Sequence, residues 1–75
     1  MNHSFYHFVL KYRGGPKGDM KAVFAESMFK DHGFPKYEES FDPLSKYIEE
    51  IADPQMPASV FDDLWKEYDD LRSLG

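Results

Sequence analysis

The sequence predicts an all-α fold, a compact bundle of four to five short helices. Apolar residues recur at the three- and four-residue spacing of a helix face in four separate segments. No segment alternates apolar and polar residues as a half-buried strand does. Glycine and proline cluster between the segments, where they end helices and open turns. At 75 residues the chain is expected to form one small helical domain over residues 1–75.

The first predicted helix begins after Ser4, a residue type that caps helix N-termini. Two adjoining apolar stripes cover it, formed by Phe5, Tyr6, Phe8, Val9, Leu10 and Tyr12. A helix that is apolar around most of its circumference is normally buried against several neighbours. We therefore expect this helix at the centre of the core, the alternative being an exposed aromatic platform. Gly14-Gly15-Pro16 ends it.

The second predicted helix covers residues 20–32, with Asp19 as its cap and Gly33 just past its end. Its apolar side carries Phe24, Ala25 and Met28, with Phe29 as a further candidate. Phe34 follows in a loop that a proline opens, and we expect its ring to fold back against the core.

The third predicted helix starts at Asp42-Pro43, a capping acid followed by proline at the first helical position. Its apolar stripe consists of Leu44, Tyr47, Ile48 and Ile51. Asp53-Pro54 ends this helix, because proline cannot continue it.

The last predicted helix is capped by Ser59, with Asp62 three residues later as an acidic variant of the capping box. Its apolar stripe consists of Phe61, Leu64, Trp65, Tyr68 and Leu71. Taken over all four helices, the residues expected to be mostly buried are Phe5, Val9, Phe24, Met28, Leu44, Ile48, Ile51, Phe61, Leu64 and Trp65.

Four stretches of the chain resemble the YozE-like family of short bacterial proteins. They are "SFYHFVLKYR", "FAESMFKDHGFPK", "SKYIEEIA" and "FDDLWKEYDDL", and the resemblance runs from Ser4 to about Tyr68. It implies a fold similar to the sterile alpha motif, two orthogonally packed α-hairpins of four to five helices. The resemblance carries no assigned activity, so any function has to be argued from the residues.

Catalytic, metal and membrane functions find little support in the sequence. The chain lacks cysteine, which excludes disulfides and thiolate zinc sites and fits a cytoplasmic location. His3 and His7 have the spacing of ligands on one helix face, but no third ligand is evident, so we expect no metal site and no cofactor. No nucleophile–base pair or carboxylate pair stands out, so we expect no enzyme. The longest apolar run is only residues 22–25, so no membrane span is expected.

Charge divides the chain into a basic and an acidic part. Residues 1–36 carry a net charge of +3 and residues 37–75 a net charge of −8, which leaves −5 overall. The asymmetry suggests two candidate binding surfaces, one of each sign. The alternative is that both surfaces are ordinary solvated helix faces that bind nothing.

The basic candidate is the glycine-rich segment 11–21, whose cations are Lys11, Arg13, Lys17 and Lys21. It leads into a helix N-terminus, where free N–H groups favour an anion, so weak nucleic-acid or anion binding is conceivable there. Asp19 would occupy the same helix end and repel phosphate, and Pro16 removes one donor. An ordinary inter-helix connection is the competing interpretation.

The acidic candidate is the outward face of the last helix, formed by Asp62, Asp63, Glu67 and Asp70. Folds of the sterile-alpha-motif type often associate through an acidic surface and a basic one. We therefore prefer a small non-catalytic protein-interaction module that contacts a basic protein partner or a second copy of itself. Binding of nucleic acid through segment 11–21 is the second hypothesis.

Overall fold

The computed structural model describes residues 4–74 as four α-helices and one turn of 3₁₀ helix. The elements in chain order are α1 (Phe5–Val9), η1 (Leu10–Tyr12), α2 (Met20–Lys30), α3 (Phe41–Ile51) and α4 (Ala58–Leu74). No strand occurs within residues 4–74, and the all-α prediction is confirmed. The first predicted helix is divided in two, because η1 continues α1 directly in a tighter winding.

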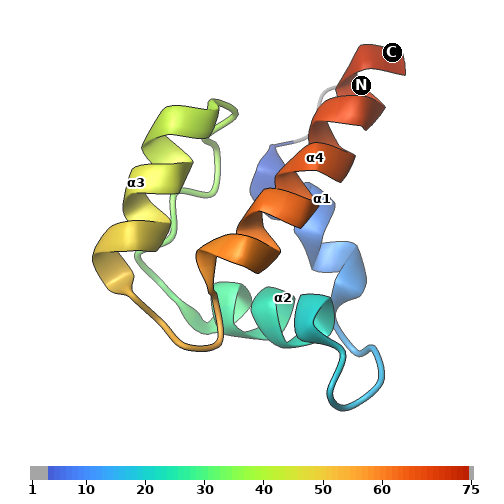
Figure 1. Cartoon of the computed structure of the whole chain (residues 1–75), viewed down its shortest axis with the longest axis vertical. Coiled ribbons are helices and arrows are strands. Elements are labelled where there is room, and N and C mark those ends of the chain that lie inside the picture. Colours follow the sequence, from blue (N-terminus) through green and yellow to red (C-terminus); the bar gives the residue numbers. More distant parts are fainter. Residues whose placement is uncertain (1–3, 75) are drawn as a thin grey trace.

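The helices pack at steep angles. Figure 1 shows α4 running along the long axis beside α1, α3 standing on the other side of α4, and α2 lying across the end of the bundle. The molecule measures 31 × 27 × 21 Å along its principal axes. This arrangement brings the first and last helices together although they are farthest apart in sequence.

Two of the predicted helix caps are confirmed. The Ser4 hydroxyl accepts a hydrogen bond from the His7 N–H at 3.3 Å, at the start of α1. The Asp19 carboxylate accepts one from the Lys21 N–H at 3.1 Å, at the start of α2. Each bond satisfies one of the backbone donors that a helix N-terminus leaves free.

The predicted end of α2 is wrong by two residues. The helix stops at Lys30, and the backbone of Asp31 is already extended. The Asp31 carboxylate accepts a hydrogen bond from the Gly33 N–H at 3.0 Å, so the side chain supports a turn where a further helical turn was expected.

The predicted starts of α3 and α4 are also wrong. Helix α3 begins at Phe41 with Ser40 as its N-cap, which places Asp42 and Pro43 inside the first turn. Helix α4 begins at Ala58, so Ser59 lies within the helix and the expected capping box does not form. The Pro57 carbonyl accepts hydrogen bonds from two later N–H groups at 3.1 Å each, and helical bonding therefore starts earlier than the serine.

The aromatic first helix lies at the centre of the core, as expected. The Phe5 side chain is fully buried, and its ring lies 5.2 Å from that of Phe61, 5.7 Å from Tyr68 and 5.9 Å from Trp65. Rings at these separations and tilts attract each other beyond the effect of area burial. An exposed aromatic platform on α1 is thereby excluded.

The ten residues expected to be mostly buried all belong to the core or pack against it, and eight of them are buried within it. Ile51 and Trp65 are only partly buried. Ile51 is the last residue of α3 and faces an open hollow, while Trp65 lies at the edge of the aromatic cluster beside Phe41, which is 39% exposed. The buried loop residue Phe34 was expected, whereas Met56, at 1% exposure, was not.

Ala52 ends α3 in a left-handed conformation, with φ 47° and ψ 40°. This region suits glycine, because a Cβ approaches the following carbonyl there. We expect Ala52→Gly to raise the free energy of unfolding by about 0.5–1 kcal/mol, the strain relieved exceeding the entropy that glycine adds to the unfolded chain. Urea unfolding of the two proteins measures the change. The matched variant Ala58→Gly, at the first residue of α4, should not stabilise; equal gains in both would refute the strain argument.

Candidate functional site

Two of the four cations in segment 11–21 already hold partners in the fold. The Arg13 guanidinium donates to both carboxylate oxygens of Glu26, each at 3.2 Å, and lies 3.6 Å from the centre of the Phe29 ring. These hydrogen bonds lower the pKa of Glu26 below its ordinary value. The stacked ring remains 44% exposed, so Arg13 covers one side of an otherwise open phenylalanine. Its charge is therefore matched within the chain.

Lys21 is the second paired cation. Its ammonium group donates to Glu67 of α4, and the Tyr12 hydroxyl donates to the other oxygen of the same carboxylate. We call Tyr12, Lys21 and Glu67 the carboxylate junction. It joins η1, α2 and α4 at one point, and the Lys21 and Glu67 side chains are 32% and 35% exposed.

The charges of the carboxylate junction stabilise one another. Burial by itself raises the pKa of Glu67, but the hydrogen bonds from Lys21 and Tyr12 outweigh it and leave that pKa below its ordinary value. The hydrogen bond to Glu67 raises the pKa of Lys21. Burial, followed by the separate hydrogen bond that the Tyr12 hydroxyl donates to Glu67, raises the pKa of Tyr12. Around neutral pH the junction therefore contains a carboxylate, an ammonium ion and a protonated phenol.

The remaining basic candidates, Lys11 and Lys17, are exposed. The Lys11 ammonium lies 4.2 Å from the centre of the Phe8 ring, a distance that allows a cation–π contact. Lys17 lies in the turn between η1 and α2, which also contains Gly14 and Gly18 with φ of 80° and 91°. The structure thus leaves two of the four candidate cations for an outside anion, and binding of nucleic acid there stays a prediction.

The four acidic candidates on α4 also differ in whether the fold pairs them with another side chain. Glu67 belongs to the carboxylate junction, whereas Asp62, Asp63 and Asp70 are exposed. Within residues 4–74, none of these three side chains takes part in an ion pair or a side-chain hydrogen bond. Asp63 still contributes to the field at Lys21, whose pKa it helps to raise. We call Asp62, Asp63 and Asp70 the acidic face from here on.

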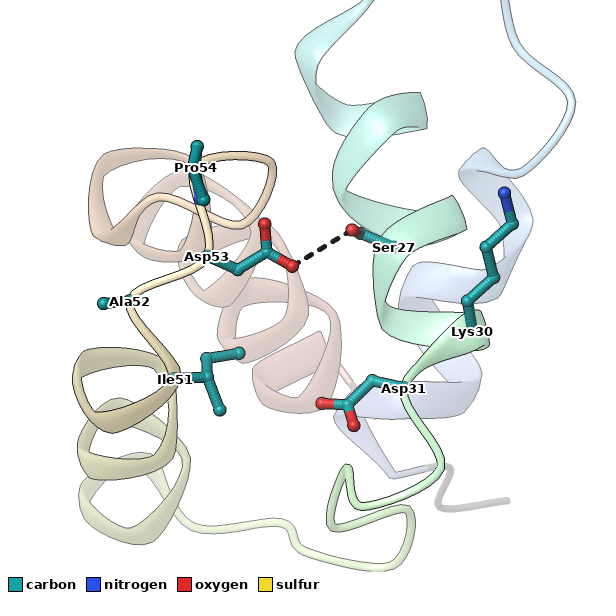
Figure 2. A pocket seen from close by; sticks show the side chains of 7 residues that line it. All are labelled: Ser27, Lys30, Asp31, Ile51, Ala52, Asp53 and Pro54. Carbon is teal, nitrogen blue, oxygen red and sulfur yellow. Dashed lines mark hydrogen bonds between the residues drawn. The ribbon is translucent and has the colours of Figure 1, made fainter.

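A hollow of about 460 Å³ lies where α2 and α3 end (Figure 2). Ser27, Lys30 and Asp31 line it from the α2 side, and Ile51, Asp53 and Pro54 from the end of α3 and the loop that follows. The left-handed residue Ala52 completes its wall. No motif in the sequence pointed to this hollow, because its lining comes from two segments that are about twenty residues apart in the chain.

Both carboxylates in the hollow are fixed by neutral donors. Asp31 accepts from the Gly33 N–H and from the Tyr47 hydroxyl, while Asp53 accepts from the Gln55 N–H at 2.9 Å. Burial, followed by the bond to Asp31, raises the pKa of Tyr47 to about 12. Tyr47 is therefore a permanent hydrogen-bond donor near neutral pH.

The described residues hold no group of three or more histidine, aspartate or glutamate side chains placed to ligate a metal ion. His7 is exposed on α1 and its ring nitrogen lies 2.8 Å from the Ser4 hydroxyl, while His3 lies outside the described residues. Among helices in residues 4–74, none is both long and apolar enough to pass through a bilayer.

The sequence could not reveal the role of Glu67. Its position beside the apolar stripe of α4 is a weak signal, because a residue at the edge of a helix face can reach the neighbouring helix. The separation of 46 residues between Lys21 and Glu67 hides the pair from any local pattern. Only the packing of α4 against α2 brings the two charges together.

Comparison with known proteins supports the fold and defines the family. The family model described as the YozE SAM-like fold matches residues 4–70. The UPF0346 protein of Staphylococcus epidermidis is 49% identical over 67 residues, covering 89% of this chain and 88% of that protein. The UPF0346 protein of Staphylococcus aureus is 49% identical over the same length, covering 89% of each chain. The family model covers most of the chain, so the chain belongs to the YozE family, whose fold is similar to the sterile alpha motif.

Proposed function

We propose that this protein is a small non-catalytic interaction module that contacts a basic protein partner through the acidic face of α4. The observation that carries the proposal is that Asp62, Asp63 and Asp70 are exposed and without an ion pair within residues 4–74, although the same helix supplies its inner side to the core. Like charges crowded on one helix repel, and a basic partner relieves this repulsion. The absence of cysteine is consistent with action in the cytoplasm.

The two sides of α4 have different surroundings: the inner side packs in the core, and the outer side faces solvent. Phe61, Leu64 and Tyr68 face inward and are 2% exposed or less. The acidic face takes no part in that packing, so it is available for recognition without a cost to the core. Glu67 is different, because it belongs to the carboxylate junction and a change there would disturb the fold as well as the surface.

The test is therefore a double charge reversal that avoids Glu67. We expect Asp62→Lys with Asp70→Lys to change the free energy of unfolding by less than about 1 kcal/mol, since both side chains are exposed. Capture of the partner from the host cell should fall about tenfold, and capture by the unchanged protein should weaken with added salt. Affinity purification with mass spectrometry measures the yield of each captured protein.

The control is Glu49→Lys with Glu50→Lys, an equal change of charge on the exposed side of α3. Loss of the same proteins with both double variants would indicate a general effect of net charge. Undiminished capture by the α4 variant would show that the acidic face is only a solvated surface, and the proposal would be abandoned.

A further inference from the structure

The hollow between the ends of α2 and α3 has the electrostatic character of a cation site. Both helices present their C-terminal turns to it, and the carbonyl ends of helices carry partial negative charge. Asp31 and Asp53 add two full negative charges from its two sides. Figure 2 shows these carboxylates reaching in from the α2 side and from the loop after α3, with the Ile51 side chain directed between them.

Neither carboxylate is neutralised by a cation of the described chain. The Asp31 oxygens accept from the Gly33 N–H and the Tyr47 hydroxyl. The Asp53 oxygens accept from the Gln55 N–H at 2.9 Å and, at 3.3 Å, from the Ser27 hydroxyl, whose single proton they share with the Gln55 side-chain oxygen at 3.0 Å. These donors are uncharged, and each carboxylate offers about four acceptor positions in all, so each retains acceptor capacity toward a ligand. The four bonds orient the carboxylates without cancelling their charge.

The walls of the hollow distinguish an organic cation from a metal ion. Ile51 and Pro54 provide apolar surface beside the carboxylates, which suits the aliphatic stem of a long side chain. A volume of about 460 Å³ is far larger than a bare ion needs, and no third acidic or histidine ligand converges there within residues 4–74. A planar guanidinium has five donors and can serve two carboxylates at once, which a compact ammonium group does less well.

We propose that this hollow binds an arginine side chain of a partner protein, with the guanidinium between Asp31 and Asp53 and the stem along Ile51. The inference goes beyond the proposed function, because no residue that lines the hollow belongs to α4. It adds a second, more specific point of contact for a basic partner. Charge complementarity selects the occupant, since the lining combines two unneutralised carboxylates and two helix C-termini.

The charge of Lys30 offers a test of the electrostatic argument for this hollow. It lines the hollow, and Figure 2 shows its ammonium group directed away from both carboxylates. Its positive charge opposes that of an incoming guanidinium. Removing this charge should therefore tighten binding, whereas removing a carboxylate should weaken it, so two variants give changes of opposite sign.

The experiment is a titration of isotope-labelled protein with N-acetyl-arginine amide, followed through the backbone amide signals in NMR spectra. We expect saturable shifts at Asp31, Ala52 and Asp53, with a dissociation constant on the order of millimolar, as befits a single side chain. N-acetyl-citrulline amide, which has the same shape without the charge, should produce no saturable shift. Equal shifts with both probes, or arginine shifts confined to α4, would overturn the proposal.

Three variants sharpen the titration. Asp53→Asn should weaken binding about fivefold and Lys30→Gln should tighten it about twofold. Asp42→Asn, at the opposite end of α3, should change nothing. The Lys30 variant keeps every carboxylate, so its result decides the matter if the Asp53 variant folds poorly; unchanged affinity there would contradict the electrostatic argument.

A dilution series separates a partner protein from a second copy of the chain. Without any probe, the signals of the hollow should not move with protein concentration. Concentration-dependent shifts at the same amides would identify another copy as the occupant and overturn the assignment to a separate partner. Charge reversal of the acidic face on α4 should leave the arginine titration unchanged, so failure of one proposal can be told from failure of the other.

Discussion

Replacing Phe5 by alanine is expected to lower the free energy of unfolding by about 3–5 kcal/mol, because a fully buried ring leaves a cavity that its neighbours cannot fill. The lost ring contacts Phe61, Trp65 and Tyr68, which lie on α4, so α1 also loses its main attachment to that helix. Domains of this size have little stability to lose. Thermal and urea unfolding followed by circular dichroism measure the change.

Trp65→Ala is the matched comparison. Periodicity predicts that Phe5 and Trp65 are both mostly buried, and the structure confirms this, but only Phe5 is buried completely. Because the tryptophan is only partly buried, we expect Trp65→Ala to lower the free energy of unfolding by about 1–3 kcal/mol, which is less than for Phe5→Ala. A larger loss for Trp65→Ala than for Phe5→Ala would contradict the packing described here.

Replacing Glu67 by lysine is expected to be the most damaging change on the outer surface of α4. It removes the acceptor of both Tyr12 and Lys21 and places a second cation beside Lys21. Hydrogen bonds to charged groups contribute about 1.5–3 kcal/mol when buried, and partial exposure reduces this, so we expect a loss of about 1–2 kcal/mol. Asp63→Lys, one turn earlier on α4, should lower the free energy of unfolding by less than half as much.

The carboxylate junction also predicts a pH dependence. The pKa of Glu67 is below its ordinary value of 4.5 in the folded chain. Its contribution to stability is thus fully present above pH 4.5 and is lost as the pH falls through the lower, folded value. Urea unfolding across pH 2–6 should show a steeper decline for the natural chain than for Glu67→Gln. Parallel curves would mean that the junction adds no net stability.

The sequence predicted the core more reliably than the helix ends or the surface contacts. The three- and four-residue periodicity identified which side of each helix faces inward, and Phe24, Leu44 and Leu64 are fully buried as expected. Periodicity gives the direction of a side chain but not its depth, so it does not distinguish the fully buried Phe5 from the partly buried Trp65. The start of α4 was missed because the Pro57 carbonyl, and not the Ser59 side chain, organises its first turn.

The candidate sites were predicted only as lists of charges. Which charges remain available depends on tertiary neighbours, and the fold pairs Arg13 with Glu26 and Lys21 with Glu67. The hollow could not be predicted at all, because its two carboxylates follow separate helices and only the tertiary fold brings them to the same hollow. Local pattern therefore indicates the composition of a surface, while packing decides which part of it can bind.

The pairing of the first helix with the last has a consequence for biosynthesis. The ribosome makes Phe5 well before the rings that cover it, which belong to residues 61, 65 and 68. At bacterial and eukaryotic elongation rates of about 5–20 residues per second, the aromatic segment stays without its partners for several seconds. The core can close only after α4 has left the ribosome. Between the time this aromatic segment emerges from the ribosome and the time α4 follows, its rings lack their partners and are accessible to chaperones.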